Sequence, residues 1–289
     1  MARMTQRRKI HRFRLDDGGT EYPVRFKEDV LAVEEPLEIR LNGTSFAVTM
    51  RTPGDDFDLV AGFLVSEGVV RHASELISLR FCAGTRDGEQ TFNVVDAQLH
   101  PDVALPDTKR NVYTSSSCGI CGTESIDAVR KTQHFDPSQD AVHIPLEVLA
   151  ALPDRLREAQ AVFDRTGGVH AAGLFRVDGS GPELLCLRED VGRHNAVDKV
   201  VGWALREGLL PLRGTVLQVS GRASFELVQK AALAGIPVLS AVSAPSSLAA
   251  DLAAETGVTL VGFNRGTSLN VYTGQERLAR PGKEATIPA

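Results

Sequence analysis

Residues 215–263 read TVLQVSGRASFELVQKAALAGIPVLSAVSAPSSLAADLAAETGVTLVGF, and this stretch decides the fold. Short apolar segments at 215–219, 237–242 and 259–263 are typical of buried strands, whereas 224–234 and 246–255 have helical periodicity. Strands that alternate with helices are typical of a layer of parallel strands joined by right-handed crossovers. The stretch therefore predicts an α/β protein, and a further helix is expected just before it, over 196–206.

Polar residues follow two of these strands. Ser220–Ser224 and Phe263–Ser268 each combine glycine, arginine and hydroxyl side chains at the point where a strand ends. Such turns suit phosphate, because backbone N–H groups and a helix N-terminus can face the anion there. Neither turn matches the P-loop or the dinucleotide-binding glycine pattern. Together they predict a pocket for an anionic, nucleotide-bearing ligand at the carboxyl ends of the strands.

The N-terminal part of the chain is rich in predicted strands. Alternating apolar residues flank Asn42-Gly43, which is a strong hairpin signal. A helix is expected over 55–66, and another over 145–163 with an interruption at Pro153. The domain organisation that we expect is a flexible basic tail over 1–20, a strand-rich subdomain over 21–135, an α/β subdomain over 136–280 and a tail over 281–289.

Cys118 and Cys121 stand in a run of glycines and serines between a predicted strand and a predicted helix that Thr123 caps. The dipole of that helix favours a thiolate, and Cys121 is the nearer of the two to its start. Three chemistries stay open at this point: part of a structural zinc site, a redox dithiol, or a persulfide carrier on a mobile loop. Cys82 and Cys186 are flanked by apolar residues and are expected to be small buried side chains.

The composition is that of an ordinary globular protein. The chain has 289 residues, 43% of them hydrophobic, with a net charge of -5 and a pI near 5.8. This balance gives no general reason to expect a nucleic-acid partner. Four cysteines are too few for a disulfide framework and favour a reducing cytoplasm. The basic N-terminus lacks the apolar segment of an export signal, and Gly235 and Pro237 break the longest uncharged segment, so no membrane insertion is expected.

Two further segments carry candidate site chemistry. Leu187–Lys199 concentrates charge between a strand and a helix, where α/β proteins place loop-borne sites, although a solvated helix start has the same composition. Val169–Gly173 matches part of the pattern of zinc-dependent deaminases, but Ala172 stands in the place of the glutamate. The cysteine pair also precedes the histidine instead of following it. Deaminase activity and a resident metal are therefore not expected.

At this level of detail the chain resembles the FdhD family, the sulfur carriers needed for formate dehydrogenase maturation. The resemblance begins near Pro36 and covers most of the chain. Several long motifs in one order carry it: Ser116–Gly122, Thr166–His170, Glu189–Lys199, Ser220–Ser224 and Val242–Ser247.

The resemblance implies a cytidine-deaminase-like three-layer α/β core without deaminase chemistry, preceded by the smaller strand-rich subdomain, and assembly as a homodimer. It implies that a cysteine desulfurase supplies persulfide sulfur, which passes to the molybdenum of the bis(molybdopterin guanine dinucleotide) cofactor for the apo-formate dehydrogenase. By motif position Cys118 bears the persulfide and Cys121 assists or resolves it. The guanine dinucleotide, or a GDP-like nucleotide in its place, contacts Phe263, Asn264, Arg265, Gly266, Thr267 and Ser268.

The leading hypothesis is therefore a cytoplasmic sulfurtransferase of the persulfide-carrier type that acts on a molybdenum or tungsten pterin cofactor. The rival hypothesis is a non-catalytic cofactor-binding chaperone whose cysteines hold zinc or form a redox lock. Helix-dipole reasoning favours Cys121 as the primary thiol, whereas the family pattern favours Cys118, and we follow the family pattern.

Overall fold

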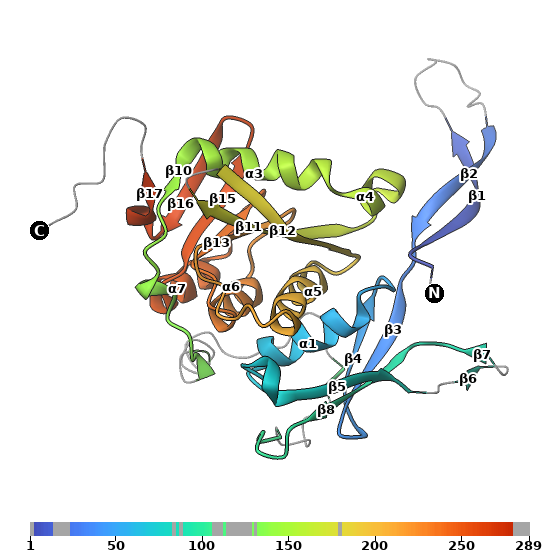
Figure 1. Ribbon diagram of the computed structural model, residues 1–289. Coiled ribbons are helices and arrows are strands. Elements are labelled where there is room, and N and C mark those ends of the chain that lie inside the picture. Colours follow the sequence, from blue (N-terminus) through green and yellow to red (C-terminus); the bar gives the residue numbers. More distant parts are fainter. Residues whose placement is uncertain are drawn as a thin grey trace, which may run out of the picture.

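A computed structural model describes residues 3–13, 24–82, 85–86, 89–105, 112–113, 129, 132–178 and 181–279. It confirms the mixed α/β class: a six-stranded sheet with helices on both faces lies beside a smaller five-stranded sheet (Figure 1). Cys118 and Cys121 fall outside the described residues, as does the start of the helix predicted after them.

The larger sheet has the strand order β12-β11-β13-β14-β15-β16. Its strands are β11 (His170–Asp178), β12 (Gly181–Asp190), β13 (Thr215–Val219), β14 (Val238–Ala241), β15 (Thr259–Arg265) and β16 (Ser268–Thr273). The three strands predicted within residues 215–263 are parallel to one another. At the two ends of the sheet, β11 is antiparallel to β13, β12 is antiparallel to β11, and β16 is antiparallel to β15. The α/β layer predicted from the alternation of strands and helices is confirmed.

Helices cover the two faces of this sheet, with α3 (Leu146–Glu158) on one and α5 (Arg193–Arg206), α6 (Phe225–Leu233) and α7 (Ser247–Thr256) on the other (Figure 1). Neighbouring strand residues alternate between two hydrophobic clusters. Leu217 and Leu239 join the cluster on the side of α5 to α7, whereas Val216 and Val238 join the cluster under α3. Because both faces are covered, these strands are mostly apolar, and their few polar side chains, such as Gln218 and Ser240, are buried.

The smaller sheet has the order β5-β8-β3-β4-β9. Its strands are β3 (Glu35–Leu41), β4 (Thr44–Arg51), β5 (Leu76–Phe81), β8 (Val94–Leu99) and β9 (Val112–Tyr113), and α1 (Asp56–Ser66) packs on it. The predicted Asn42-Gly43 hairpin is confirmed. Both residues have positive φ, 50° and 85°, which is the backbone that a tight turn with the twist of a hairpin requires.

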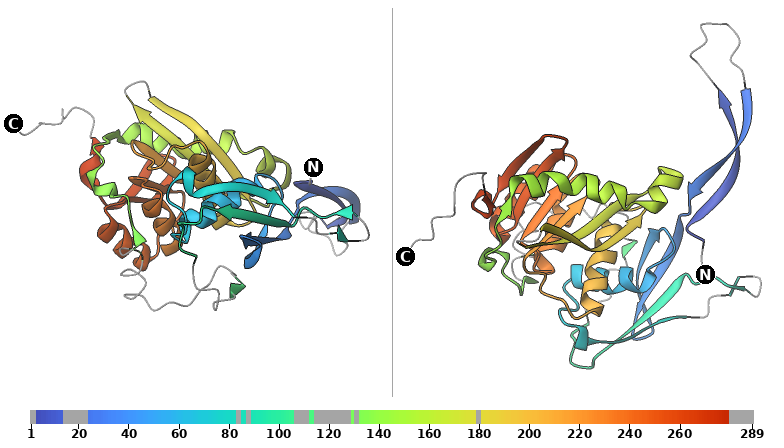
Figure 2. Two further views of the ribbon diagram at one scale, coloured as in Figure 1. Left: turned by 60° about the horizontal axis from the view of Figure 1, so that its bottom comes forward. Right: turned by 45° about the horizontal axis from the view of Figure 1, so that its top comes forward.

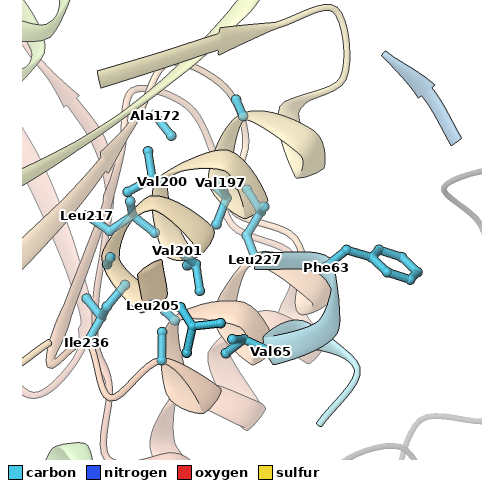
Figure 3. Close-up of a cluster of buried hydrophobic side chains, with 14 of the residues drawn as sticks. Phe63, Val65, Ala172, Val197, Val200, Val201, Leu205, Leu217, Leu227 and Ile236 are labelled. Carbon is cyan, nitrogen blue, oxygen red and sulfur yellow. The ribbon is translucent and has the colours of Figure 1, made fainter. Parts of the chain in front are cut away.

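A crossing of two helices joins the two sheets: α1 packs directly against α5 (Figure 3). A Cβ atom on Gly62 would overlap the carbonyl oxygen of Asp198, and one on Gly202 would overlap that of Asp58. The backbones therefore touch at two glycines, one from each helix, and side chains such as Val65, Val201 and Leu205 fill the space around them.

Residues 5–13 are not the frayed tail that the basic sequence suggests. They form β1 (Thr5–Phe13), which pairs over nine residues with β2 (Val24–Ala32) in an antiparallel hairpin that projects from the body (Figures 1 and 2). At its base the N–H of Val33 donates to the carbonyl of Met4 over 2.9 Å. A basic and largely exposed segment can form a strand once a partner strand supplies the backbone hydrogen bonds.

Short elements complete the chain. They are α4 (Ala161–Thr166), β6 (Thr85–Arg86), β7 (Glu89–Gln90), β10 (Ile144–Pro145), β17 (Leu278–Ala279) and single 3-10 turns at Ala73–Glu75, Pro137–Gln139 and Gln275–Arg277. In the part of the chain that the structure describes, no helix is long and apolar enough to cross a membrane.

Candidate functional site

A cavity of about 630 Å³ lies where the strands of the larger sheet end. Ser220, Val242 and Arg265 follow or close β13, β14 and β15, and all three line it. Since β11 runs antiparallel to β13, its first residue, His170, lies at the same edge. Val191 and Gly266, which follow β12 and β15, also line the cavity. The remaining wall comes from α3, α4 and the segments around them: Pro153, Asp154, Leu156, Arg157, Gln160, Phe163, Gly167, Gly168 and Val169. The pocket predicted at the carboxyl ends of the strands is therefore present.

The charged side chains of the cavity are mainly cationic. Arg157 and Arg265 line it, and Asp154 is the one acid among the lining residues. Each arginine lies over an aromatic ring, with the guanidinium carbon of Arg157 4.7 Å from the centre of the Phe163 ring and that of Arg265 5.7 Å from the centre of the Phe263 ring. The two arginines favour an anionic ligand, and Phe163, which unlike Phe263 belongs to the lining, offers a ring on which a planar base can stack.

His170 is the titratable group at the β11 side of the cavity. Burial lowers its pKa, and the positive charge of Arg193 and the neighbouring His194 lower it further, against the opposing effect of Asp190. The imidazole is therefore neutral at pH 7 and acts there as a hydrogen-bonding group.

The backbone of β15 changes direction next to the predicted ligand-contact segment. Phe263 has a φ of 51°, which is unusual for a residue with a side chain, and the pairing of β15 with β16 is irregular between Gly262 and Arg265. A β-bulge of this kind re-aims the residues that follow it. It places Arg265 and Gly266 at the cavity, whereas Thr267 and Ser268 are exposed and do not belong to its lining.

Asn264 has a different position from its neighbours, because its side chain is fully buried. Its Nδ2 donates to the carbonyl of Leu149 in α3 over 2.8 Å and to Oγ of Ser240 over 2.9 Å. Pro153 lacks the N–H that would otherwise bond to the Leu149 carbonyl. Asn264 supplies the missing donor, so α3 continues through Pro153 to Glu158 instead of breaking there as predicted. The Asn264 amide nitrogen therefore holds α3 over the end of β15, whereas the buried Oδ1 has no hydrogen-bond partner among the described residues.

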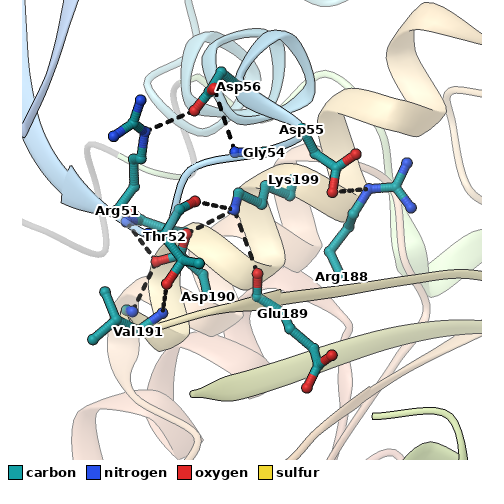
Figure 4. A network of polar contacts seen from close by, with 12 residues as sticks. Arg51, Thr52, Gly54, Asp55, Asp56, Arg188, Glu189, Asp190, Val191 and Lys199 are labelled. Carbon is teal, nitrogen blue, oxygen red and sulfur yellow. Dashed lines mark hydrogen bonds and ion pairs between the residues drawn. The ribbon is translucent and has the colours of Figure 1, made fainter. Parts of the chain in front are cut away.

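The charged segment Leu187–Lys199 is mostly structural. Lys199 is fully buried and forms an ion pair of 2.8 Å with Asp190, which also accepts a hydrogen bond from the N–H of Thr52 (Figure 4). Glu189 accepts hydrogen bonds from the N–H groups of Val162 and Phe163, so that a strand of the larger sheet caps α4. These contacts fix the cavity wall and tie it to the smaller sheet.

The cysteines divide into two groups. Cys118 and Cys121 lie outside the described residues, so their predicted roles stay predictions. Burial raises the pKa of Cys186 to about 12, as expected for an inert buried thiol, whereas Cys82 is half-buried. Among the described residues there is no group of three or more His, Cys, Asp or Glu side chains that could hold a metal ion.

Sequence reasoning missed the wall that α3 and α4 contribute to the cavity. Arg157, Gln160 and Phe163 belong to a segment that reads only as an amphipathic helix, so their polar and aromatic groups gave no separate signal. The following segment, Thr166–His170, was noted for the family resemblance and for part of the deaminase pattern. It also supplies Gly167, Gly168 and His170 to the lining.

Comparisons with known proteins agree with this geometry. A model of the FdhD/NarQ family matches residues 32–279. The chain belongs to the FdhD/NarQ family. Similar family members include the sulfur carrier protein FdhD of Streptomyces avermitilis, 62% identical with 96% of this chain and 97% of the relative covered. That of Mycobacterium tuberculosis is 55% identical, with 87% of this chain and 92% of the relative covered.

A solved structure supports the fold of the family. The crystal structure assigned as a formate dehydrogenase accessory protein from Desulfotalea psychrophila superimposes with a TM-score of 0.73 at 24% identity. It covers 96% of this chain and 100% of its own. The likeness extends over both sheets of the family fold.

Proposed function

We propose that this protein is a sulfur carrier that takes persulfide sulfur from a cysteine desulfurase and passes it to the molybdenum cofactor, bis(molybdopterin guanine dinucleotide), for an apo-formate dehydrogenase. The observation that carries the proposal is the cationic cavity at the strand ends, with Arg265 and Gly266 on its lining. It occurs in a chain of the FdhD/NarQ family, whose relatives are named sulfur carrier proteins. We further propose that the chain works in the cytoplasm as a homodimer.

The cavity suits the nucleotide part of this cargo. Its volume of about 630 Å³ lies within the range of pockets that enclose small ligands. Arg265 and the backbone of Gly266 would meet phosphate, and the Phe163 ring with Arg157 above it would meet the base. The remaining predicted contacts, Thr267 and Ser268, lie on the exposed turn that follows.

The sulfur step belongs to Cys118 and Cys121. The Cys118 thiolate attacks the outer sulfur of the donor persulfide, a new S–S bond forms, and the donor thiolate leaves and takes up the proton. When the Cys121 thiolate then attacks Sγ of Cys118, a disulfide forms and the outer sulfur leaves as hydrosulfide for the cofactor metal. A thiol reductant returns the disulfide to two thiols, so that atoms and electrons balance over the cycle.

Intact-protein mass spectrometry after incubation with a cysteine desulfurase and cysteine tests the carrier role. Wild type should gain one sulfur, about 32 Da, that a reductant removes. Cys118→Ala should gain none, whereas Cys82→Ala, a half-buried thiol elsewhere in the chain, should behave as wild type. If no variant acquires sulfur while guanine nucleotide still binds, the protein is a cofactor chaperone instead.

Binding of GDP tests the nucleotide site separately. Arg265→Ala should weaken it by about 1–3 kcal/mol, the range for hydrogen bonds to a charged group. Asn270→Ala, on exposed β16, is the matched control and should leave the affinity unchanged. Equal affinity in the Arg265 variant would remove that residue from the site.

A further inference from the structure

An arginine and two imidazoles lie close together beside the cavity at its β11 side. A Cβ atom on Gly221 would lie 3.5 Å from Nδ1 of His170 and 3.8 Å from Cδ of Arg193, so both side chains border the same turn after β13. Arg193 opens α5, and His194 follows it. Of these residues His170 lines the cavity itself, whereas Arg193 lies beside the same turn and does not belong to the lining.

The guanidinium group of Arg193 has one nitrogen without a partner among the described residues. Its Nε is buried, and no described residue gives it a hydrogen-bond partner. Asp190, the nearest acid of the same segment, is engaged in the ion pair with Lys199 and accepts from the N–H of Gly192. Shielding a guanidinium nitrogen from water without a partner is unfavourable, so this position favours the arrival of an anion.

This region is well separated from the Arg265 turn. Along the edge of the sheet His170 begins β11 and Arg265 ends β15, with β13 and β14 between them. Three strand spacings of about 4.8 Å place the two backbones about 14 Å apart. A single phosphate cannot contact both, whereas a nucleotide with a second anionic group at its far end can.

We propose that His170, with Arg193 beside the same Gly221 turn, forms a second anion subsite of the cavity, at the end opposite the Arg265–Gly266 turn. This rests on the proposed function in that the nucleotide phosphate occupies the Arg265 end. The second subsite then takes the anionic group at the other end of the same ligand, which in the proposed cargo is the metal with its thiolate ligands. His170 is the binding residue and Arg193 the positioning residue.

Proton uptake on binding follows from the charges around His170. Arg193 and His194 of α5 and Asp190 of β12 act on its titration, and Arg157, Asp154 and Arg265 line the same cavity. An anion beside the imidazole raises the pKa that burial and these cations have lowered. Below neutral pH the protein should therefore take up a proton when the subsite fills.

Calorimetric titration with sulfate, which does not itself titrate near neutral pH, tests the proposal on the full-length chain saturated with GMP. Wild type should bind one sulfate alongside GMP, with proton uptake seen as a dependence of the heat on the buffer. Arg193→Gln should weaken sulfate about tenfold or more and GMP less than about twofold, and Arg193→Lys should restore part of the loss. His170→Asn should abolish the proton uptake.

Arg213→Gln is the control, since this exposed arginine lies at the opposite end of β13. Competition between sulfate and GMP in wild type, or unchanged sulfate binding in Arg193→Gln with folding confirmed by circular dichroism, would overturn the second subsite. Failure of GMP to bind wild type would instead count against the proposed nucleotide site. In that case the second subsite would still be tested by sulfate titration without GMP, in which Arg193→Gln should bind sulfate more weakly than wild type.

Discussion

The α1–α5 crossing and the β1–β2 hairpin are both pairs of regular elements, but the protein holds them in opposite ways. At the crossing, backbone touches backbone at Gly62 and Gly202. In the hairpin no side chain with a described environment is buried, and Phe26 is 80% exposed. The comparison shows that the closer packing lies at the α1–α5 contact, between the two sheets. This contact fixes the position of the smaller sheet relative to the cavity wall.

The ion pairs of the two regions differ in burial in the same way. Around the crossing, Asp190 and Lys199 are both fully buried and pair with each other. On the hairpin, the ion pair between Arg7 and Glu28 spans 3.5 Å, with side chains 78% and 58% exposed. A buried pair depends strongly on both members, whereas an exposed pair contributes little. Substitutions should therefore have very different effects in the two regions.

The largest effect is expected for Lys199→Met. It leaves the buried Asp190 carboxylate without its cation, and should lower the free energy of unfolding by about 3–5 kcal/mol. Denaturant titration measures this. The same substitution on the hairpin, Lys27→Met, should change stability by less than about 0.5 kcal/mol. Similar losses in the two variants would remove the distinction between the regions.

A second test uses a single methyl group. Gly202→Ala forces the backbones of α1 and α5 apart, which should reduce stability by about 1–3 kcal/mol or more. Gly168→Ala is the matched control at the base of the hairpin, because its Cβ would lie 3.6 Å from Cβ of Ala32, an ordinary contact. Thermal unfolding of both variants measures the difference. If Gly202→Ala were as stable as wild type, the two helix backbones would be less closely packed than the structure shows.

A third substitution addresses the packing of α3 over the larger sheet. Asn264→Leu leaves the Leu149 carbonyl without a donor inside the protein, and should cost about 1–3 kcal/mol of stability. Asn270→Leu, at an exposed position of β16, should have little effect. GDP binding measured on folded Asn264→Leu tests for a ligand contact, because unchanged affinity would show that the amide does not contact the nucleotide.

The smallest effect is expected on the hairpin itself. Phe26→Ser removes a ring that is 80% exposed, and should leave the free energy of unfolding within about 0.5 kcal/mol. Phe63→Ser is the counterpart in the body, where the ring is 8% exposed, and should be strongly destabilising. A large loss in the Phe26 variant would show that the hairpin packs against something in solution.

Local patterns predicted the α/β layer and the Asn42-Gly43 turn, because strand length, helical periodicity and turn chemistry each lie within a few neighbouring residues. They also placed polar groups at the strand ends, where the cavity is found. The continuation of α3 through Pro153 was not predictable in this way, since the donor that permits it comes from Asn264 in a distant strand.

Other parts of the site depend on topology in the same manner. His170 reaches the cavity because β11 runs antiparallel to β13, and this reversal has no local signature. The strand Thr5–Phe13 was expected to be a tail because its partner strand, not its own composition, stabilises it. Glu189 caps α4 from another element, so the sequence of Leu187–Lys199 left a site and a helix start both open and did not indicate this supporting contact.

The bond between Asn264 and the carbonyl of Leu149 also limits how this sequence can vary. Asparagine at 264 supplies the donor that Pro153 withholds, so replacement of the proline by alanine would leave the amide with its bond to Ser240 as its main partner. Related chains without the proline should therefore tolerate substitution at the end of β15 more readily than chains that have it. Pro153 and Asn264 connect α3, which lines the cavity, to the end of β15, so variation at one position should be linked to variation at the other. Neither residue need touch the ligand for this to hold.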